Sequence, residues 1–430
     1  MNNATRMTIR MYRQGLGDCF LLSIPKKSGG EFHMVVDCGL IQGAPQDAGD
    51  KMPRIVADIG ARTSNVVDVL VATHQHWDHM SGFVAQLGDF QKLKVRSAWL
   101  GWIENPSDAQ AKQLAQGRGQ AVAALGAAIG LLHAAGAAAL ADDVTPYAEN
   151  LGIGAAGGIG QAMDNVRALA GNVVTYCDPS GAPLAIADTD VRVFVLGPPR
   201  DQTLLHRMSA SASSGEMYAI AASVGGAFGG DAGEPWIPFA GTVSAPIEAA
   251  KADPFFIERY FGGVDAGWRN IDSAWLAGAS DLAIQLDSFT NNTSLVLAFE
   301  FPGGDVALFP GDAQIGSWES WLTLRWKLPD AEVTGADLLR RCVFYKVGHH
   351  GSHNATMRQG GLETMTALHT AMVPVDHAMA VKKNWTRMPL PEILTALTQT
   401  TGSRVIRVDD QALAPGIGAV SNELYYEVSI

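Results

Sequence analysis

The apolar positions of the chain gather into short runs near both ends of the sequence, a pattern typical of β-strands. In the first hundred residues this pattern predicts strands at 6–14, 19–25, 32–39 and 68–74. The last of these, DVLVATH, is continuously apolar, which indicates a strand buried on both faces of a sheet. The polar residues that follow it therefore begin where a buried strand ends.

The same pattern returns in the last third of the chain. Strands are predicted at 293–301, 306–312, 342–350, 370–376 and 403–410, with a helix at 389–401. The segment PGGD joins the first two of these strands and predicts a tight turn. Strands mixed with helices near both ends of the chain indicate an α/β fold built in layers.

Residues 104–285 differ from the two flanking regions. They contain the Ala/Gly-rich run 121–141, glycine-rich loops such as 224–236, and one strand-like piece at 190–199. We expect residues 1–103 and 286–430 to form one domain, with 104–285 as an insertion or cap, although glycine-rich stretches also serve as plain connectors. The run 121–141 is long enough to span a bilayer, but its small residues favour a packing helix.

Composition sets the broad class of the protein. The 430 residues are 47% hydrophobic and 17% charged, which predicts a folded globular chain. The net charge of −12 disfavours a globally basic nucleic-acid-binding surface, but it permits a local basic groove. Four scattered cysteines without a CxxC pair argue against a disulfide framework or a cysteine-based zinc site. The amino-terminal segment lacks the apolar core of a signal peptide, so we expect a cytoplasmic protein without a membrane anchor.

Histidine is concentrated just after the buried strand 68–74. The chain has 11 histidines, and His74, His76 and His79 lie within six positions, together with Asp78. Residues two apart in an extended chain point the same way, so His74 and His76 can reach one ion. Asp78 and His79 follow the bend of the chain and can reach a second ion. Nitrogen and oxygen ligands of this kind suit Zn²⁺, and also Mn²⁺ or Fe.

Other strand ends carry the same side-chain types. Asp312 ends one predicted strand in LFPGD, His349 and His350 end another in YKVGHH, and Asp37 ends a third in VVDCG. Each segment alone is typical of a turn. Beside the histidine cluster they predict a shared metal site, because strand ends converge when the strands share a sheet edge.

The segment His74-Gln75-His76-Trp77-Asp78-His79 reproduces the His-x-His-x-Asp-His signature of the metallo-β-lactamase superfamily. More narrowly, GLGDCFLL, NNTSLVLAFE leading to FPGD, and KVGHHGS resemble the ComEC-type branch of that superfamily. The resemblance covers about residues 1–100 and 285–410.

The resemblance implies an αββα sandwich with a site for two metal ions at one edge. It implies the following roles: His74, His76 and Asp312 on one ion; Asp78, His79, Asp312 and His349 on the other; and Asp37 behind the ligands as an orienting residue. Many members of the superfamily place a further histidine ligand between the signature and the bridging aspartate. Here that interval holds only His133 and His206, in unrelated contexts. The sequence leaves open which of His349 and His350 contacts metal.

The predicted chemistry is hydrolysis by a metal-activated hydroxide, in which two ions, Zn²⁺ first, stabilise the attacked group. Asp78 is expected to act in catalysis as well as in metal binding, and His350 or His353 is expected to protonate the leaving group. The resemblance implies a phosphodiesterase or nuclease, with a nucleic acid or nucleotide as substrate. The basic stretch VKKNWTR (381–387) could hold a phosphate backbone, or it could be a solvated face.

Two alternatives remain. The first is hydrolysis of a small-molecule ester, lactone or thioester, which the acidic charge and the apolar insertion favour. The second is a non-catalytic, metal-stabilised domain that binds a partner. The fold alone cannot decide among them.

Overall fold

The computed structural model describes residues 6–134, 138–207, 247–262, 277–329, 331–413 and 417–430. The chain divides into two compact units. Unit 1 comprises Met1–Ala115, Glu149–Ser214 and Asp287–Ile430, and unit 2 comprises Gln116–Ala148 and Gly215–Leu286. Loop 224–236 and some other parts of the predicted insertion lie outside the described residues.

Two large sheets form unit 1 among the residues described. The first sheet has the order β18 (Val420–Ser421), β19 (Tyr425–Ser429), β1 (Thr8–Tyr12), β2 (Cys19–Pro25), β3 (Glu31–Cys38), β5 (Val69–Ala72), β7 (Ala98–Gly101) and β8 (Val174–Cys177). The second sheet has the order β17 (Val405–Arg407), β16 (Thr370–Val373), β15 (Cys342–Lys346), β12 (Val306–Phe309), β11 (Val296–Glu300), β10 (Arg192–Gly197) and β9 (Leu184–Ala185). The short pairs β4 (Val66–Val67) with β6 (Lys94–Val95), and β13 (Arg325–Lys327) with β14 (Glu332–Thr334), lie outside these sheets.

The sheets pack face to face because each central strand is apolar on both sides. In β2, Phe20 and Leu22 point into a core shared with the second sheet, while Leu21 points to the opposite face. Phe20 contacts Phe309 of β12 edge to face, with ring centroids 5.9 Å apart. The two-residue alternation of strand side chains thus supplies apolar groups to two cores at once.

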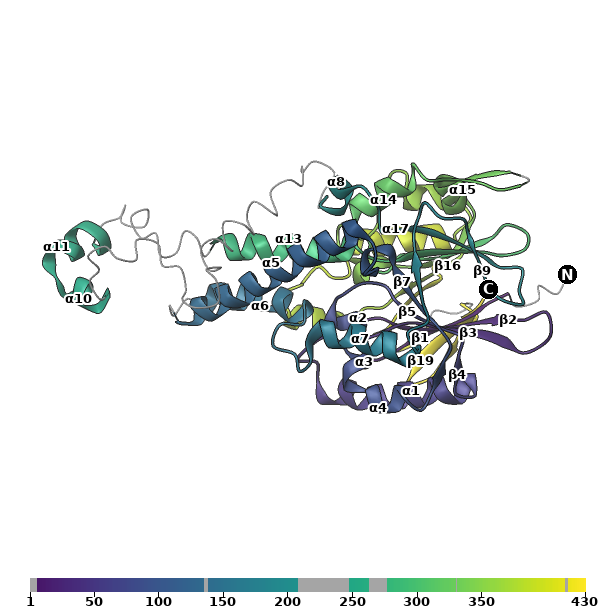
Figure 1. Ribbon diagram of the computed structural model, residues 1–430, viewed down its shortest axis with the longest axis horizontal. Helices are drawn as coiled ribbons and strands as arrows, with labels where there is room; N and C mark the ends of the chain where they lie inside the picture. The colour runs from purple at the N-terminus through teal and green to yellow at the C-terminus, as the bar shows by residue number, and fades with distance from the viewer. Residues whose placement is uncertain (1–5, 135–137, 208–246, 263–276, 330, 414–416) are drawn as a thin grey trace. The chain divides into compact units, whose positions relative to one another are not determined.

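Helices cover the outer faces of both sheets (Figure 1). The first sheet is covered by α1 (Gln46–Thr63), α2 (Trp77–Met80), α3 (Gly82–Ala85), α4 (Leu87–Phe90) and α7 (Gly158–Leu169). The second is covered by α14 (Ile315–Trp321), α15 (Gly335–Arg340), α16 (His377–Lys382) and α17 (Pro391–Thr401). Helix α1 illustrates why the helices pack there. Its residues Met52, Ile55, Val56 and Ile59 recur at helical spacing and are buried against the outer face of the first sheet. The predicted α/β class is therefore confirmed, as is the helix predicted at 389–401.

Residues 149–214 join unit 1, although the sequence assigned them to the insertion. They supply α7, β8 and β10, and β10 pairs with β11 in the second sheet. The physical reason is that β10, RVFVLG, is buried along nearly its whole length and needs partners on both sides. Helix α8 (Gln202–Leu205) follows it.

Unit 2 is helical where it is described. It includes most of α5 (Ala109–Ala134) and α6 (Ala138–Asn150), together with α10 (Ile247–Ala252), α11 (Pro254–Phe256), the helical turn Ile257–Phe261 and the start of α13 (Ala277–Asn292). Its described core is small and consists of Ala128, Leu132, Ala141 and Ala279. Among the described residues, no helix is long and apolar enough to cross a membrane.

Candidate metal centre

Side chains from both sheets meet where four strands end. Asp37 lies at the end of β3 and His74 follows β5, both in the first sheet. Asp312 follows β12, and His350 follows β15 of the second sheet. The sequence predicted convergence along one sheet edge, whereas the structure joins the ends of two sheets. A backbone hydrogen bond from Leu295 N to Thr73 O, 2.8 Å long, ties the two edges together.

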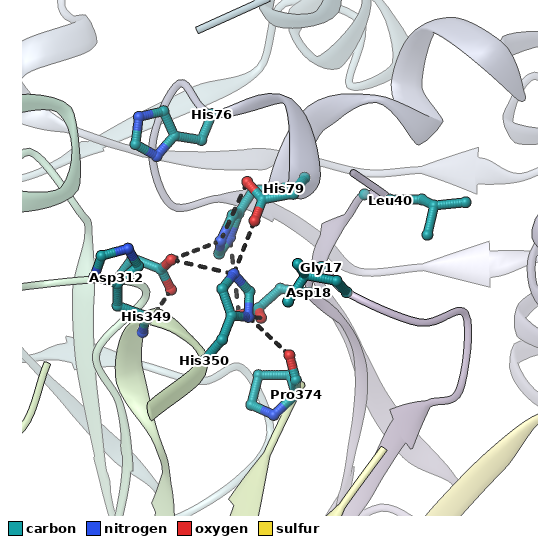
Figure 2. Close-up of polar contacts among 12 residues, drawn as sticks. Gly17, Asp18, Leu40, His76, His79, Asp312, His349, His350 and Pro374 are labelled. Atoms are coloured by element: carbon teal, nitrogen blue, oxygen red, sulfur yellow. Dashed lines mark hydrogen bonds and ion pairs between the residues drawn. The ribbon is translucent and has the colours of Figure 1, made fainter. Parts of the chain in front are cut away.

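A group of four buried side chains in this region could hold a metal ion (Figure 2). They are Asp18, His79, Asp312 and His350, whose ligand atoms all lie within 4.8 Å of one another. Asp78 adjoins the group, because its Oδ2 lies 2.8 Å from Nε2 of His350. His79 Nε2 lies 3.2 Å from Asp312 Oδ2.

Several atoms at this centre are buried without a hydrogen-bond partner. Asp18 Oδ1, Asp78 Oδ1, His76 Nε2 and His79 Nε2 all belong to this class. A buried polar atom that has lost its hydrogen bonds to water and has gained no other partner costs free energy, so such atoms are rare in folded proteins. Asp18 and His79 belong to the four-residue group and Asp78 adjoins it, and oxygen and nitrogen atoms of this kind are the donor set that a divalent cation satisfies. These residues therefore fit a metal ion.

The imidazole rings of His79 and His350 are each oriented by a hydrogen bond at Nδ1. Nδ1 of His79 lies 2.8 Å from Oδ2 of Asp37, and Nδ1 of His350 lies 2.7 Å from the carbonyl oxygen of Pro374. Asp37 is itself fixed by Thr73, whose backbone N and Oγ1 both donate to its carboxylate. An acceptor at Nδ1 leaves Nε2 to face the centre, as in the carboxylate–histidine–metal arrangement. Asp37 thus has the contacts of the orienting residue that the resemblance implied.

His74 and His76 lie beside this group and face each other. Nε2 of His74 and Nδ1 of His76 are 3.1 Å apart, and Nδ1 of His74 lies 3.0 Å from Oγ1 of Thr73. Burial lowers the pKa of both imidazoles, to about 3 for His76. Both rings are therefore neutral near pH 7 and keep a lone pair for a cation.

His79 behaves differently in the absence of a cation. Burial lowers the pKa of its imidazole, but the Asp312 and Asp18 carboxylates raise it more strongly, so that it lies above its ordinary value. The proton on His79 then supplies positive charge that the carboxylates attract. A metal ion at Nε2 would replace that proton, so metal binding is expected to release it.

His350, rather than His349, belongs to the four-residue group. The resemblance implied His349 as ligand, the sequence left the choice between His349 and His350 open, and His350 or His353 was expected to be the proton donor. Both residues have positive φ, and consecutive side chains diverge from this strained turn. The ring nitrogens of His349 instead lie 3.4 Å from the amide nitrogen of Asn291 and 3.3 Å from that of Gln314. Its backbone N donates to Asp312 Oδ1, so His349 positions the aspartate through its main chain.

The other residues expected to act on substrate lie outside the four-residue group. His353 is exposed, and its Nδ1 lies 3.5 Å from Oγ of Ser352. In the basic stretch 381–387, Lys383 forms an ion pair with Glu149, and Arg387 forms one with Glu392. These two cations are therefore already neutralised by carboxylates of the chain, which weakens the prediction that the stretch holds a phosphate backbone.

Asp18 and Lys346 are site residues that sequence reasoning missed. The ammonium of Lys346 is buried, forms an ion pair with Asp18, lies 3.1 Å from Asp312 Oδ1 and donates to the Gly311 carbonyl oxygen at 2.7 Å. Burial lowers the pKa of Lys346, but Asp18 and Asp312 raise it above its ordinary value, so the ammonium is charged. The available signals were Asp18 immediately before β2 in GLGD and a lysine ending the apolar strand CVFYK.

The buried charges at the centre do not balance. The carboxylates that surround it are those of Asp18, Asp37, Asp78, Asp287 and Asp312, all buried. In the part of the chain that the structure describes, Lys346 is the buried ammonium that faces them. The pKa of Asp287 rises to about 8, because of its burial and the nearby carboxylates of Asp78 and Asp312. Excess negative charge of this kind requires protons or divalent cations.

Close backbone contacts hold Asp18 beside Asp78. Asp18 N donates to Asp78 O at 3.0 Å, and Gly39 N donates to Asp18 O at 2.8 Å. A Cβ on Gly39 would lie 2.1 Å from the carbonyl oxygen of Asp78. Only glycine allows β3 to pass this close to α2, so position 39 helps to set the geometry of the ligand group.

No protein-family model matches the chain, and neither the curated proteins nor the solved structures contain a significant match. The candidate centre is thus defined by its own residues and their geometry.

Proposed function

We propose that the protein is a metal-dependent hydrolase of the metallo-β-lactamase type that uses two divalent ions. One observation carries the proposal: ligand atoms of Asp18, His79, Asp312 and His350 are buried and lie within 4.8 Å of one another. The intact signature His74–His79 supports it. So do two facing sheets with helices on both outer faces and a centre at their strand ends.

The residues divide between two places for ions. Asp18, His79, Asp312 and His350, with Asp78 adjoining them, would hold one ion, and His74 and His76 would begin the place for the other. Divalent ions bound there supply Lewis acidity and lower the pKa of a coordinated water. Lys346 and the backbone N of His349 keep Oδ1 of Asp312 engaged, so Oδ2 is the oxygen directed at His79.

His350 is not free to transfer a proton in this arrangement. Its Nδ1 is committed to the Pro374 carbonyl oxygen and its Nε2 to the ligand group. We therefore assign a ligand role to His350, in place of the proton-donor role that the sequence offered for His350 or His353. Asp78, also expected in catalysis, would act through the ion that it holds.

The substrate class that we propose is a phosphodiester, because two neighbouring ions stabilise the attacking and leaving oxygens of an in-line displacement. The net charge of −12 and the ion-paired Lys383 and Arg387 favour a small diester, such as a nucleotide, over a long nucleic acid. The acidic chain also keeps hydrolysis of a small ester, lactone or thioester as the second candidate.

Metal content per chain and hydrolysis of bis-p-nitrophenyl phosphate, measured on one sample with and without Zn²⁺ or Mn²⁺, test the proposal. About two ions and metal-dependent cleavage are expected, and Asp312→Asn should lose both. Bound metal with cleavage of p-nitrophenyl acetate but not of the diester would favour the second candidate. Bound metal without any hydrolysis would support a non-catalytic domain, and absence of metal under all conditions would refute the proposal.

A further inference from the structure

Among the described residues, no evident histidine joins His74, His76 and Asp312 at the place for the second ion. Between the signature and Asp312, the sequence offers His133 and His206. His133 is exposed on α5, and His206 stacks on Phe289 with ring centroids 4.7 Å apart. Neither accounts for the buried and unpaired Nε2 of His76.

The group that faces this nitrogen is a carboxylate from α13. Oδ1 of Asp287 lies 3.5 Å from His76 Nε2, and both side chains are buried. The other oxygen, Oδ2, accepts a hydrogen bond of 3.1 Å from the side-chain amide of Asn291, one helical turn later. Asn291 thus holds Oδ2, the Asn150 side chain also hydrogen-bonds to the carboxyl group, and Oδ1 is the oxygen beside His76.

We propose that Asp287 is a positioning residue for the second ion: it accepts the Nε2–H of His76 and thereby commits Nδ1 of His76, together with Nε2 of His74, to that ion. The inference rests on the proposed function. A neutral imidazole carries one proton, so an acceptor at Nε2 leaves the lone pair at Nδ1. A shift of a few tenths of an ångström brings the 3.5 Å separation to hydrogen-bond length.

The spacing of the two histidines agrees with this assignment. Tetrahedral ligands with bonds of about 2.0–2.1 Å lie about 3.3–3.4 Å from each other. The observed separation between His74 Nε2 and His76 Nδ1 is 3.1 Å, close to this value. The arrangement also repeats that of His79, whose Nδ1 has Asp37 behind it at 2.8 Å. Each of these two histidines then has one nitrogen at a carboxylate and the other toward an ion.

Two substitutions at position 287 separate this role from others. Asp287→Asn keeps an oxygen acceptor at the same place, whereas Asp287→Leu keeps the size and removes the acceptor. Asp281→Asn, at an exposed acid on the same helix, is the matched control. Zn²⁺ affinity is measured for each chain by titration against a chromophoric chelator. The Co²⁺-loaded absorption spectrum reports ligand geometry, and circular dichroism reports folding.

The wild type and Asp281→Asn should bind two ions alike. Asp287→Asn should bind two ions, one of them about tenfold more weakly, and Asp287→Leu should lose about a hundredfold in affinity for that ion. Unchanged affinities in Asp287→Leu would overturn the inference. An Asn variant as impaired as the Leu variant would also overturn it, since Asp287 would then act as a ligand or through its charge. A wild type that binds one ion refutes the second site alone, whereas one that binds none refutes the proposed function.

Discussion

Lys346 offers the sharpest test of how the centre is held together. Its ammonium is buried and contacts Asp18, Asp312 and the carbonyl oxygen of Gly311. Lys346→Met keeps the length and apolar stem of the side chain but removes the charge and three donors. Removing one partner of a buried ion pair typically costs about 3–5 kcal/mol, because the remaining charge is left uncompensated. We expect a loss of this size in the free energy of unfolding of the metal-free protein.

The loss should become smaller when metal is bound. Divalent ions supply positive charge to the same carboxylates, so the bound ions partly replace the ammonium. The assay is urea unfolding followed by circular dichroism, in EDTA and in excess Zn²⁺. Lys327→Met, at an exposed end of β13, is the control and should change stability by less than about 0.5 kcal/mol.

Two results would refute this reasoning. The first is a loss below about 1 kcal/mol for Lys346→Met in EDTA, which is the effect of an average substitution and not of a broken buried ion pair. The second is a loss that grows on addition of Zn²⁺, because the ammonium would then be holding the ligands for the metal rather than substituting for its charge.

Three further predictions concern the signature, the backbone and pH. The double variant Asp78→Ala/His79→Ala should abolish diester hydrolysis and keep its far-UV circular dichroism; normal turnover would contradict a two-ion mechanism. Gly39→Ala should lose metal binding, measured as zinc content, because its Cβ would lie 2.1 Å from the Asp78 carbonyl oxygen, whereas Gly49→Ala, with no neighbour within 4 Å, should bind normally. Burial lowers the pKa of His206 from 6.5 to about 4, so its stabilising effect is present above pH 6.5 and is lost as pH falls toward 4. Between pH 7 and pH 4 the free energy of unfolding, measured with urea, should therefore fall by about 2–3 kcal/mol less in His206→Phe than in the wild type. Identical pH profiles of the two proteins would show that His206 does not cause this part of the pH dependence.

Sequence periodicity was sufficient for the layered α/β class and for most strands of the two sheets. Strands such as β2 and β11 are apolar on consecutive positions because both of their faces are buried, and this property is visible locally. The strand β10 could also be predicted from the sequence, but the fact that it belongs to unit 1 could not. Which unit a strand joins depends on the partner that it pairs with, and that partner, β11, lies about a hundred residues away in the chain.

The signature histidines could likewise be found from sequence, because a local spacing carries their chemistry. Asp18 and Lys346 carried only weak local signals, GLGD before a strand and a lysine at the end of an apolar strand, and Asp287 carried none. Their roles arise from long-range packing: α13 brings Asp287 to His76, and β15 carries Lys346 between Asp18 and Asp312. Tertiary structure also decided that His350, and not His349, joins the four-residue group. Both residues have positive φ in a turn whose conformation depends on the folded chain, and the sequence does not show which of the two side chains faces the centre. The sequence by itself thus determined the types of ligand and the strands that carry them. The tertiary structure decided which charged groups surround them, because electrostatic contacts depend on distance in space and not on separation along the chain.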